Sequence, residues 1–384
     1  MEAIKTIEAA MIPSGQQSTV RVTVTTEHGS TGTAELPAGI SVGSSEAKLV
    51  DPAQAVRTIT DLISPALVGS DVLEQRSIDQ KLMELDGTTD RSHLGVNSLL
   101  PVSLATCRAA AGALSRPLYH HIAELAHAAV KLPIPIQVMI EGGAHAPVGS
   151  TGVTLQECSL IGPTADGERV LTALTQLVAN QRGATQSGGE GGLILPIQSN
   201  HDALQYLAVA AAQVGLSAPQ FAIDIAASHT ALSPDELMQL MHDFPLAVVE
   251  DPVAEDDLAA WSAFTTAHGQ QLIVAADDLT VGNPLLIKDA VKSGTANALV
   301  VKLNQTATLS ELFDLIDLVR VGNWQIIISH RGHETPDAFI ADLAVGVGAD
   351  YLKAGTTRSP ERKTKYERLA VIATEISQPS PTAR

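Results

Sequence analysis

The feature that most constrains the fold is a repeat of short apolar runs, separated by helical patterns, that recurs about every 25 residues. The six clearest runs are FAIDIA (221–226), LAVVED (246–251), QLIVAAD (271–277), NALVVKLN (297–304), WQIIISHR (324–331) and YLKAG (351–355). Nearly continuous apolar runs of this length are typical of strands buried on both faces of a parallel sheet. The alternation from residue 133 onward therefore predicts repeated βα units, enough of them to close a (β/α)₈ barrel.

The clearest helical pattern in this repeat starts with SPDE at residues 233–236. Ser233 suits the N-cap, Pro234 suits the first helical position, and Glu236 would complete a capping box. The apolar residues that follow have the i, i+3, i+4, i+7 spacing of one helix face: Leu237, Leu240, Met241 and Phe244. The sequence thus predicts an amphipathic helix between the first two of the six runs.

A different pattern precedes the barrel repeat. Residues 18–26 (STVRVTVTT) alternate apolar and polar side chains, and TGTAELP follows after a short turn, which together predict a β-hairpin. The segment 37–47 is rich in Gly and Ser without an apolar period, and a loop of this length suggests a functional role. Helical patterns follow at 53–67, near 78–84 and at 97–115. We therefore expect a small α+β domain over residues 1–128 and a barrel domain over residues 129–384.

Charge and cysteine content argue against several classes of function. The chain of 384 residues carries 24 Lys and Arg against 42 Asp and Glu, and this net charge of −18 disfavours nucleic acid and anionic membranes as partners. Its two cysteines, Cys107 and Cys158, argue against a disulfide scaffold and a thiolate zinc site and favour a cytoplasmic location. The N-terminus has no targeting pattern and no run approaches ~18 apolar residues, so we expect neither a leader nor a membrane span.

Charged residues stand at or near the end of each of the six apolar runs. They are Asp224, Glu250, Asp277, Lys302, the pair His330–Arg331, and Lys353, at intervals of 26, 27, 25, 28 and 23 residues. In a (β/α)₈ barrel the carboxyl ends of the strands meet on one face, where active sites lie. A single such residue could simply cap a neighbouring helix, but a charged group on six consecutive strands indicates a site.

The types of residue in this set suggest a chemistry. Three carboxylates on successive strands, without Cys, make an oxygen-only ligand set that suits Mg²⁺. The cations on the following strands would face that metal, so an anionic substrate could bridge the two. A lysine near a divalent cation and other cations has a lowered pKa and can act as a base. This combination suggests removal of a weakly acidic proton α to a carboxylate, with metal charge stabilising the product anion.

In its motifs the chain resembles the enolase family of phosphopyruvate hydratases over nearly its whole length. The matching segments, in order, are MELDGTTDRSHLGVNSLLPVSLATCRAAA (83–111), GGAHA (142–146), LQE (155–157), GEGG (189–192), DIAAS (224–228), VEDP (249–252), ADDLTVGNP (276–284), VVKLNQ (300–305), SHRGHET (329–335) and ADLAVG (341–346). The resemblance implies a small N-terminal α+β domain followed by an enolase-type (β/α)₈ barrel whose second strand is antiparallel to the others. It also implies a glycolytic lyase that converts 2-phosphoglycerate to phosphoenolpyruvate and water.

The resemblance assigns the chemical steps to three residues. Lys302, in VVKLNQ, would take the C2 proton of 2-phosphoglycerate. Glu190, in GEGG, would protonate the departing 3-hydroxyl group. Glu157, in LQE, would assist Glu190 and hold water.

The resemblance assigns the other polar residues to binding. A first Mg²⁺, which holds the substrate carboxylate, would be bound by Asp224, Glu250 and Asp277. Lys353 would contact the same carboxylate, and Arg331 would bind the phosphate, with His330 and His145 nearby. Ser41, in the 37–47 loop, would close over the site and help to bind a second Mg²⁺.

Several positions depart from the family pattern. Gly189 stands where the family usually has an Asp, which removes a neighbour that would orient Glu190 or tune its pKa. Gly332 and His333 replace a Ser-Gly pair beside the phosphate end. The other departures are Ser44 and Ser45 in the 37–47 loop, Ala354–Gly355 after the last lysine, and Gly15 in place of an arginine at the family's dimer contact. The sequence leaves open whether the chain forms a homo-oligomer, but it does not predict the family's dimer contact.

Three functions therefore stay open. The first is the enolase reaction itself, on a small phosphorylated carboxylic acid with two Mg²⁺ ions per site. The second is a related dehydratase that acts on a modified substrate, as carboxyphosphonoenolpyruvate synthase does, and the changes at Gly332 and His333 favour it. The third is a non-catalytic enolase-like binding protein, against which the retained Lys302, Glu190 and three carboxylates argue.

Overall fold

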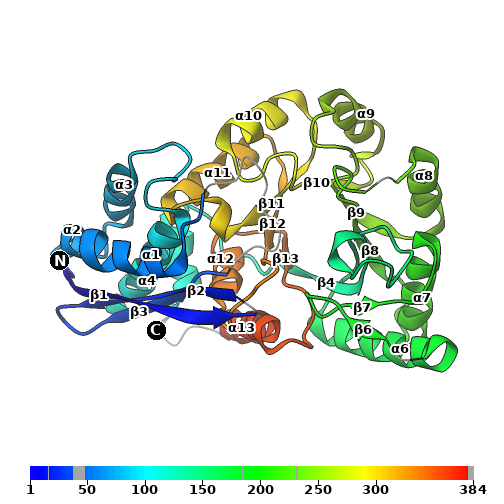
Figure 1. Ribbon diagram of the computed structural model, residues 1–384, viewed down its shortest axis with the longest axis horizontal. Coiled ribbons are helices and arrows are strands. Elements are labelled where there is room, and N and C mark those ends of the chain that lie inside the picture. Colours follow the sequence, from blue (N-terminus) through cyan, green and yellow to red (C-terminus); the bar gives the residue numbers. More distant parts are fainter. Residues whose placement is uncertain (16, 38–47, 184, 231, 379–384) are drawn as a thin grey trace.

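The computed structural model describes residues 1–15, 17–37, 48–183, 185–230 and 232–378. A small part built of a sheet and helices lies beside a larger barrel (Figure 1). The fold class predicted from the sequence, an α+β domain followed by a (β/α)₈ barrel, is confirmed. Nearly all of the predicted 37–47 loop, including Ser41, Ser44 and Ser45, lies outside the described residues.

The N-terminal sheet has three antiparallel strands: β1 (Ile4–Ser14), β2 (Gln17–Thr26) and β3 (Thr31–Glu35). β2 and β3 form the predicted hairpin. β1 was not expected, because most of its side chains are exposed or half-buried and show no clear period. The helices that follow are α1 (Pro52–Thr58), the π-helical turn η1 (Ile59–Ile63), α2 (Ser64–Leu67), α3 (Gln75–Asp86), α4 (Val96–Ala113) and α5 (Leu118–Leu125). α4 lies so close to β3 that a Cβ atom on Gly32 would be 2.0 Å from the Ala105 carbonyl oxygen.

Eight strands close the barrel: β4 (Ile134–Glu141), β5 (Glu157–Ile161), β8 (Gln220–Asp224), β9 (Leu246–Glu250), β10 (Ile273–Ala276), β11 (Ala298–Lys302), β12 (Gln325–Ser329) and β13 (Tyr351–Lys353). The last six coincide with the apolar runs of the sequence, and β13 pairs in parallel with β4 to complete the ring. β5 is antiparallel to its neighbours β4 and β8, as the family resemblance implies. It therefore presents its first residue, Glu157, at the face where the other strands end.

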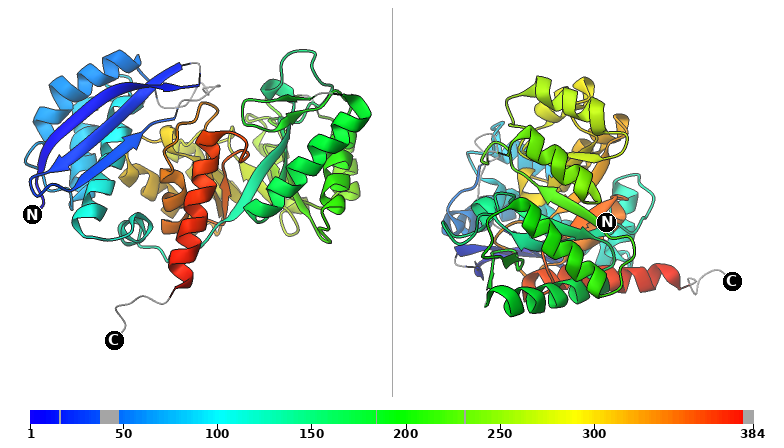
Figure 2. Two further views of the ribbon diagram at one scale, coloured as in Figure 1. Left: turned by 90° about the horizontal axis from the view of Figure 1, so that it is seen from below. Right: turned by 90° about the vertical axis from the view of Figure 1, so that its right-hand side faces the viewer.

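Helices surround the barrel, as the views in Figures 1 and 2 show. They are α6 (Thr164–Arg182), α7 (Asn200–Gln213), α8 (Pro234–Asp243), α9 (Leu258–His268), α10 (Pro284–Ser293), α11 (Leu309–Val321), α12 (Phe339–Gly346) and α13 (Pro360–Ser377). α8 begins as predicted, since Ser233 accepts a hydrogen bond from the Glu236 N–H at 3.1 Å. The Glu236 side chain accepts from Asn200 of α7 in place of the expected reciprocal bond. Among the helices of the described residues, none combines the length and the hydropathy needed to cross a membrane.

Strand alternation explains why the charged side chains at the strand ends lie inside the barrel mouth. Successive side chains of a strand point to opposite faces, so a residue shares its face with the residue two places before it. A compact apolar cluster, separate from the main core, includes Ala222, Val248, Ala275, Val300 and Ile327. These residues lie two places before Asp224, Glu250, Asp277, Lys302 and Ser329. The apolar cluster thus fills the barrel beneath the polar residues at its mouth.

Three short elements complete the mouth of the barrel. A hairpin of β6 (Gln186–Ser187) and β7 (Leu193–Ile194) is attached to β4 through the pairing of Ile140 with Leu193, and its turn carries the GEGG segment. Two 3₁₀ turns, η2 (Gly143–His145) and η3 (Leu303–Gln305), follow β4 and β11. Because all three lie at or beside the carboxyl ends of strands, they place further side chains at the mouth.

Candidate active site

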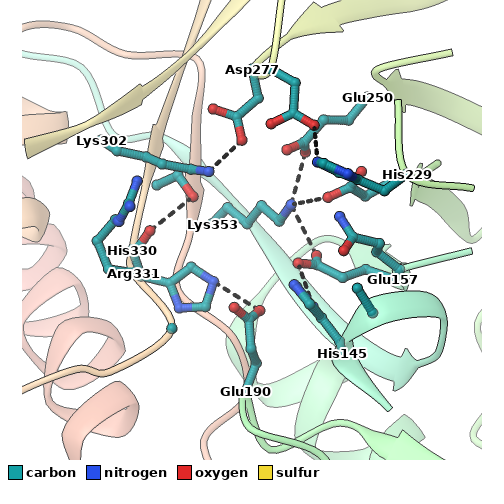
Figure 3. A pocket seen from close by; sticks show the side chains of 16 residues that line it. His145, Glu157, Glu190, His229, Glu250, Asp277, Lys302, His330, Arg331 and Lys353 are labelled. Atoms are coloured by element: carbon teal, nitrogen blue, oxygen red, sulfur yellow. Dashed lines mark hydrogen bonds and ion pairs between the residues drawn. The ribbon is translucent and has the colours of Figure 1, made fainter. Parts of the chain in front are cut away.

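The ends of the barrel strands surround a cavity of about 190 Å³. The predicted site residues that line it are His145, Glu157, Glu190, Asp224, Glu250, Asp277, Lys302, His330, Arg331 and Lys353 (Figure 3). Further lining residues, not selected from the sequence, include Gln156, His229, Asp278 and Ser329. Ser41, the remaining predicted residue, lies outside the described residues. Each barrel strand, or the segment that directly follows it, therefore contributes to one site.

The pairing of the strands places the acidic side chains next to one another and the lysines on the strands that follow. β5, β8 and β9 pair so that Glu157 lies opposite Asp224 and Asp224 lies opposite Glu250. We call these three residues, with Asp277 after β10, the acidic arc. On the remaining strands, Lys302 pairs with Ser329 and Ser329 pairs with Lys353. The two lysines thus lie on β11 and β13, on the side of the mouth where β13 pairs with β4 to close the barrel.

Lys353 reaches the centre of the acidic arc. Its Nζ atom lies 2.8 Å from Glu250 Oε2, 2.9 Å from Glu157 Oε2 and 3.6 Å from Asp224 Oδ2 (Figure 3). Burial lowers the pKa of an ammonium group, but these carboxylates outweigh burial and raise the pKa of Lys353 well above its ordinary value. Lys353 therefore stays charged and neutralises part of the arc.

Lys302 contacts the Asp277 carboxylate from the other side of the cavity (Figure 3). Burial would lower the pKa of Lys302, but the charge of Asp277 raises it above the ordinary value. The lowered pKa predicted from the sequence depends on a neighbouring divalent cation, whereas here the Asp277 carboxylate turns its charge toward Lys302. Lys302 must therefore leave Asp277 before it can accept a proton.

The acidic arc fits a divalent cation. Two of its buried carboxylate oxygens, Asp224 Oδ1 and Asp277 Oδ1, have no hydrogen-bond partner within the described part of the chain. A buried polar oxygen is costly unless a donor or a cation satisfies it. Burial also raises the pKa of Asp224 to about 6, and burial together with the charge of Asp224 raises that of Glu250 to about 7. An excess of oxygen ligands and negative charge suits a hard ion such as Mg²⁺.

Asp251 joins the acidic arc although sequence reasoning missed it. Its oxygens come within 4.8 Å of those of Asp224 and Glu250 in one group, and of Asp277 and Asp278 in another. The Asp251 carboxylate accepts the N–H groups of Asp277 at 3.1 Å and of Asp278 at 2.9 Å. Its own φ of +45° is strained for a residue other than Gly, as is common at functional sites. Asp251 thus positions the turn that carries Asp277. In the sequence, the only signal for this role was that Asp251 directly follows Glu250 in the VEDP motif.

Glu190 lies in the β6–β7 turn and approaches His330. His330 Nε2 lies 3.1 Å from Glu190 Oε2, and Arg362 contacts the other ring nitrogen, Nδ1. Burial lowers the pKa of His330 to about 4, so the ring is neutral, and donation by Arg362 to Nδ1 leaves the ring proton on Nε2. Burial would raise the pKa of Glu190, but His330 and Arg362 hold it well below its ordinary value. Glu190 is therefore ionised in this arrangement.

Glu157 differs from Glu190 in protonation. Burial raises the pKa of Glu157 well above its ordinary value, although Lys353 opposes the shift. His145 Nδ1 lies 3.8 Å from Glu157 Oε1, and one ligand atom from each of His145, Glu157 and Glu190 falls within 4.8 Å of the others. Neighbouring carboxyl groups with pKa values pushed apart suit acid–base chemistry, because one keeps its proton to higher pH than the other.

Arg362, in the C-terminal helix α13, supports the site from outside the barrel. Its Nη2 atom donates to Gly189 O at 3.0 Å and to Gly332 O at 2.8 Å. With the contact to His330, these bonds tie the Glu190 turn to the segment after β12. Arg362 is fully buried. An arginine is rarely buried to this extent unless its charge has partners, which these contacts provide.

Lys365 supports the same segment one helical turn later. Its Nζ atom lies 2.7 Å from Glu334 Oε2, and the Glu334 carboxylate accepts the Arg331 N–H at 2.9 Å. Sequence reasoning missed both Arg362 and Lys365. The available signal was their spacing, because they share the buried face of α13 with Tyr366, Leu369 and Ile372.

The two changes at the expected phosphate end lie in different places. Gly332 lines the cavity, whereas His333 packs against the turn between β1 and β2. A Cβ atom on Gly15, whose φ is +59°, would lie 2.8 Å from His333 Nδ1, and Ser14 Oγ donates to the His333 carbonyl at 3.0 Å. The sequence placed His333 beside the phosphate end, but His333 joins the N-terminal sheet to the barrel and does not line the cavity.

Two family models match the chain. The model described as "Enolase, N-terminal domain" matches residues 4–122, and the model described as "Enolase, C-terminal TIM barrel domain" matches residues 129–235 and 230–383. A curated protein named enolase from Anaplasma phagocytophilum is 34% identical, over 95% of this chain and 93% of that protein. Another of that name, from Kineococcus radiotolerans, is 35% identical, over 97% of this chain and 94% of that protein. The similarity thus covers both parts of the fold.

Proposed function

Because the chain belongs to the enolase family, we propose that it converts 2-phosphoglycerate to phosphoenolpyruvate and water. Family membership makes it a lyase of the phosphopyruvate hydratase type. The observation that supports the specific reaction is that Lys302, from β11, and Glu190, from the β6–β7 turn, reach one cavity from different sides (Figure 3). A base and an acid placed in this way can remove a proton from C2 and deliver one to the oxygen on C3.

Lys302 is the proposed base. Its Nζ atom takes the proton from C2, the electron pair of that bond forms the C2–C3 double bond, and the C3–O bond breaks. Bound by Asp224, Glu250 and Asp277, Mg²⁺ would supply positive charge that stabilises the negative charge developing on the substrate carboxylate. Asp277 would then no longer hold Lys302 in its charged form, while the nearby charge of Arg331 lowers the pKa of that lysine.

Glu190 is the proposed acid, and its protonation state sets a condition on the mechanism. Its low pKa leaves it ionised, while the raised pKa of Glu157 leaves the proton there. The hydroxyl group leaves C3 as water only if Glu190 carries a proton. We infer that the bound anionic substrate raises the pKa of Glu190, so that a proton passes to it from Glu157.

Arg331 and Lys353 are the proposed binding cations for the phosphate and the carboxylate, with His145 and His330 beside them. A second Mg²⁺ at Ser41, a cytoplasmic location and a boundary between domains near residue 128 belong to the same proposal. The second candidate function is the dehydration of an analogue with a modified phosphorus group. Gly332 favours it, because a residue without a side chain lines the cavity there.

The test is the change Lys302→Ala, assayed with 2-phosphoglycerate and Mg²⁺ for the enol product. The rate should fall by at least the ~10²–10⁴-fold typical of a lost general base. The variant should also fail to exchange the C2 hydrogen with heavy water at saturating substrate. A folded Lys302→Ala protein that exchanges this hydrogen at the wild-type rate would place the base elsewhere. Wild-type protein without turnover of 2-phosphoglycerate would favour the second candidate function.

A further inference from the structure

Glu141 is a buried carboxyl group that the mechanism above does not use. It is the last residue of β4, its exposed fraction is 0%, and it lies directly behind the β6–β7 turn. Its Oε1 atom accepts the Gly192 N–H at 2.7 Å and the Glu190 N–H at 3.1 Å, and its Oε2 atom lies 3.2 Å from the same Glu190 nitrogen. One side chain thus holds the backbone of the proposed acid and of a residue two places later.

The shape of the turn fits the Glu141 side chain. A Cβ atom on Gly188 would lie 2.2 Å from Glu141 Oε2, and one on Gly192 would lie 3.0 Å from Oε1. The turn also closes on itself, because the Gly188 N–H donates to the Gly192 carbonyl at 2.9 Å. Glycine at both positions therefore allows the backbone to wrap closely around the carboxyl group.

The contact of Glu141 with the β6–β7 turn matters because open space lies beside that turn. A cavity of about 330 Å³ lies next to the turn, lined by Glu141, His145, Ser187, Gly188, Gly189 and Glu190. On the other side, the turn is held by the bond from Arg362 to Gly189 O. Since the β6–β7 pairing is only two residues long, the strands alone offer little resistance to movement of the turn.

We propose that Glu141 is a positioning residue, which fixes the backbone of Glu190 so that its carboxyl group faces the C3 oxygen of the substrate. This inference rests on the proposed function of Glu190 as the acid. It predicts that the loss of Glu141 impairs departure of the hydroxyl group and spares proton removal by Lys302.

The test compares two variants of equal length, Glu141→Gln and Glu141→Met, with the shorter Glu141→Asp as a third. Glutamine keeps an oxygen that can accept both N–H groups, whereas methionine fills the space without an acceptor and aspartate falls short of the turn. For Glu141→Met and Glu141→Asp, kcat should fall on the order of 10- to 100-fold, as when a reacting group shifts by about 1 Å. KM and the rate of C2 hydrogen exchange should stay close to wild type, and Glu141→Gln should retain most of kcat.

A second readout does not depend on turnover. Amide hydrogen exchange of a peptide covering 186–194, followed by mass spectrometry, should accelerate about tenfold in Glu141→Met and Glu141→Asp, the effect of one lost hydrogen bond. It should stay near wild type in Glu141→Gln and in Asp79→Asn, a control at another buried carboxylate that accepts a backbone N–H.

These readouts separate the two proposals. Absence of turnover and of C2 exchange in the wild type would remove the proposed function, while the protection of residues 186–194 would still test the contact. Unchanged protection and unchanged kcat in both Glu141→Met and Glu141→Asp would overturn the positioning role. An equal fall in turnover and C2 exchange would also overturn it, because the defect would then not be confined to Glu190.

Discussion

Replacing Lys353 with methionine removes the one ammonium group that contacts three members of the acidic arc, among the residues described in the structure. Methionine keeps most of the volume and the apolar stem, so the change mainly removes charge. Glu157, Asp224 and Glu250 would then stay buried without this partner. Breaking a buried ion pair by removing one member costs about 3–5 kcal/mol. We expect at least this loss in the free energy of unfolding at pH 8, measured in chelator.

The expected shift in Tm follows from the size of the chain. For 384 residues, the entropy of unfolding near Tm is about 0.8 kcal/mol/K, so the loss corresponds to roughly 4–6 °C. The loss should also depend on pH. Burial raises the pKa of each of the three carboxyl groups and Lys353 opposes that shift, so without Lys353 they would hold their protons to still higher pH. Stability of the variant therefore falls as pH rises through these pKa values, and the deficit should be smaller at pH 5 than at pH 8.

The assay is thermal unfolding followed by circular dichroism at both pH values. The matched control is Lys131→Met, because Lys131 forms an exposed ion pair with Asp350 and should shift Tm by less than about 1 °C. A Lys353→Met protein as stable as Lys131→Met at pH 8 would refute the claim that Lys353 neutralises the arc. A deficit of equal size at pH 5 and pH 8 would refute the assignment of the effect to carboxyl groups.

The further predictions concern the metal and the phosphate end. Excess chelator should abolish turnover, as should Asp277→Ala, and full activity in chelator would contradict the metal site. Mg²⁺ should bind the substrate-free protein more weakly at pH 6 than at pH 8 by titration calorimetry, because protons compete for Asp224 and Glu250, whose pKa values are about 6 and about 7. The double change Gly332→Ser and His333→Gly should leave 2-phosphoglycerate turnover similar or better if the protein acts on that substrate. Turnover that is low in the wild type and rises in the double variant would indicate a substrate with a modified phosphorus group. Gly332→Ser alone should account for any change in specificity, since Gly332 lines the cavity, and an effect confined to His333→Gly would contradict this.

The parts of the fold that the sequence predicted are those governed by local periodicity. The six apolar runs became β8 to β13 because each contains enough apolar residues to define a buried strand by itself. Their charged ends then met at one face as a consequence of barrel geometry. The direction of β5 is different, because nothing in ECSLI distinguishes a parallel from an antiparallel strand, and only the family resemblance supplied it.

The residues that sequence reasoning missed act through contacts between distant segments. Glu141 ends a strand, like the predicted site residues, but its partners lie in the GEGG segment about 50 residues later. Arg362 was not selected from the sequence, and its partners include carbonyl groups of two other loops. His333 was placed at the phosphate end by its neighbours in the chain, whereas the β1–β2 turn determines where its ring packs. Spacing can mark Arg362 as a residue on a buried helix face, but it does not identify the distant groups that Arg362 contacts.

The order of residues along the chain gives barrel closure a consequence for synthesis on the ribosome. Glu157, Asp224, Glu250 and Asp277 are made first, and the two lysines that contact them, Lys302 and Lys353, are made afterwards. β4 has no partner on this edge until residues 351–353 of β13 have been made. Any strands that form before β13 is made would keep an unpaired edge at β4, and such edges are prone to wrong association. Closure of the ring and neutralisation of the arc are completed together, because β13 both pairs with β4 and carries Lys353.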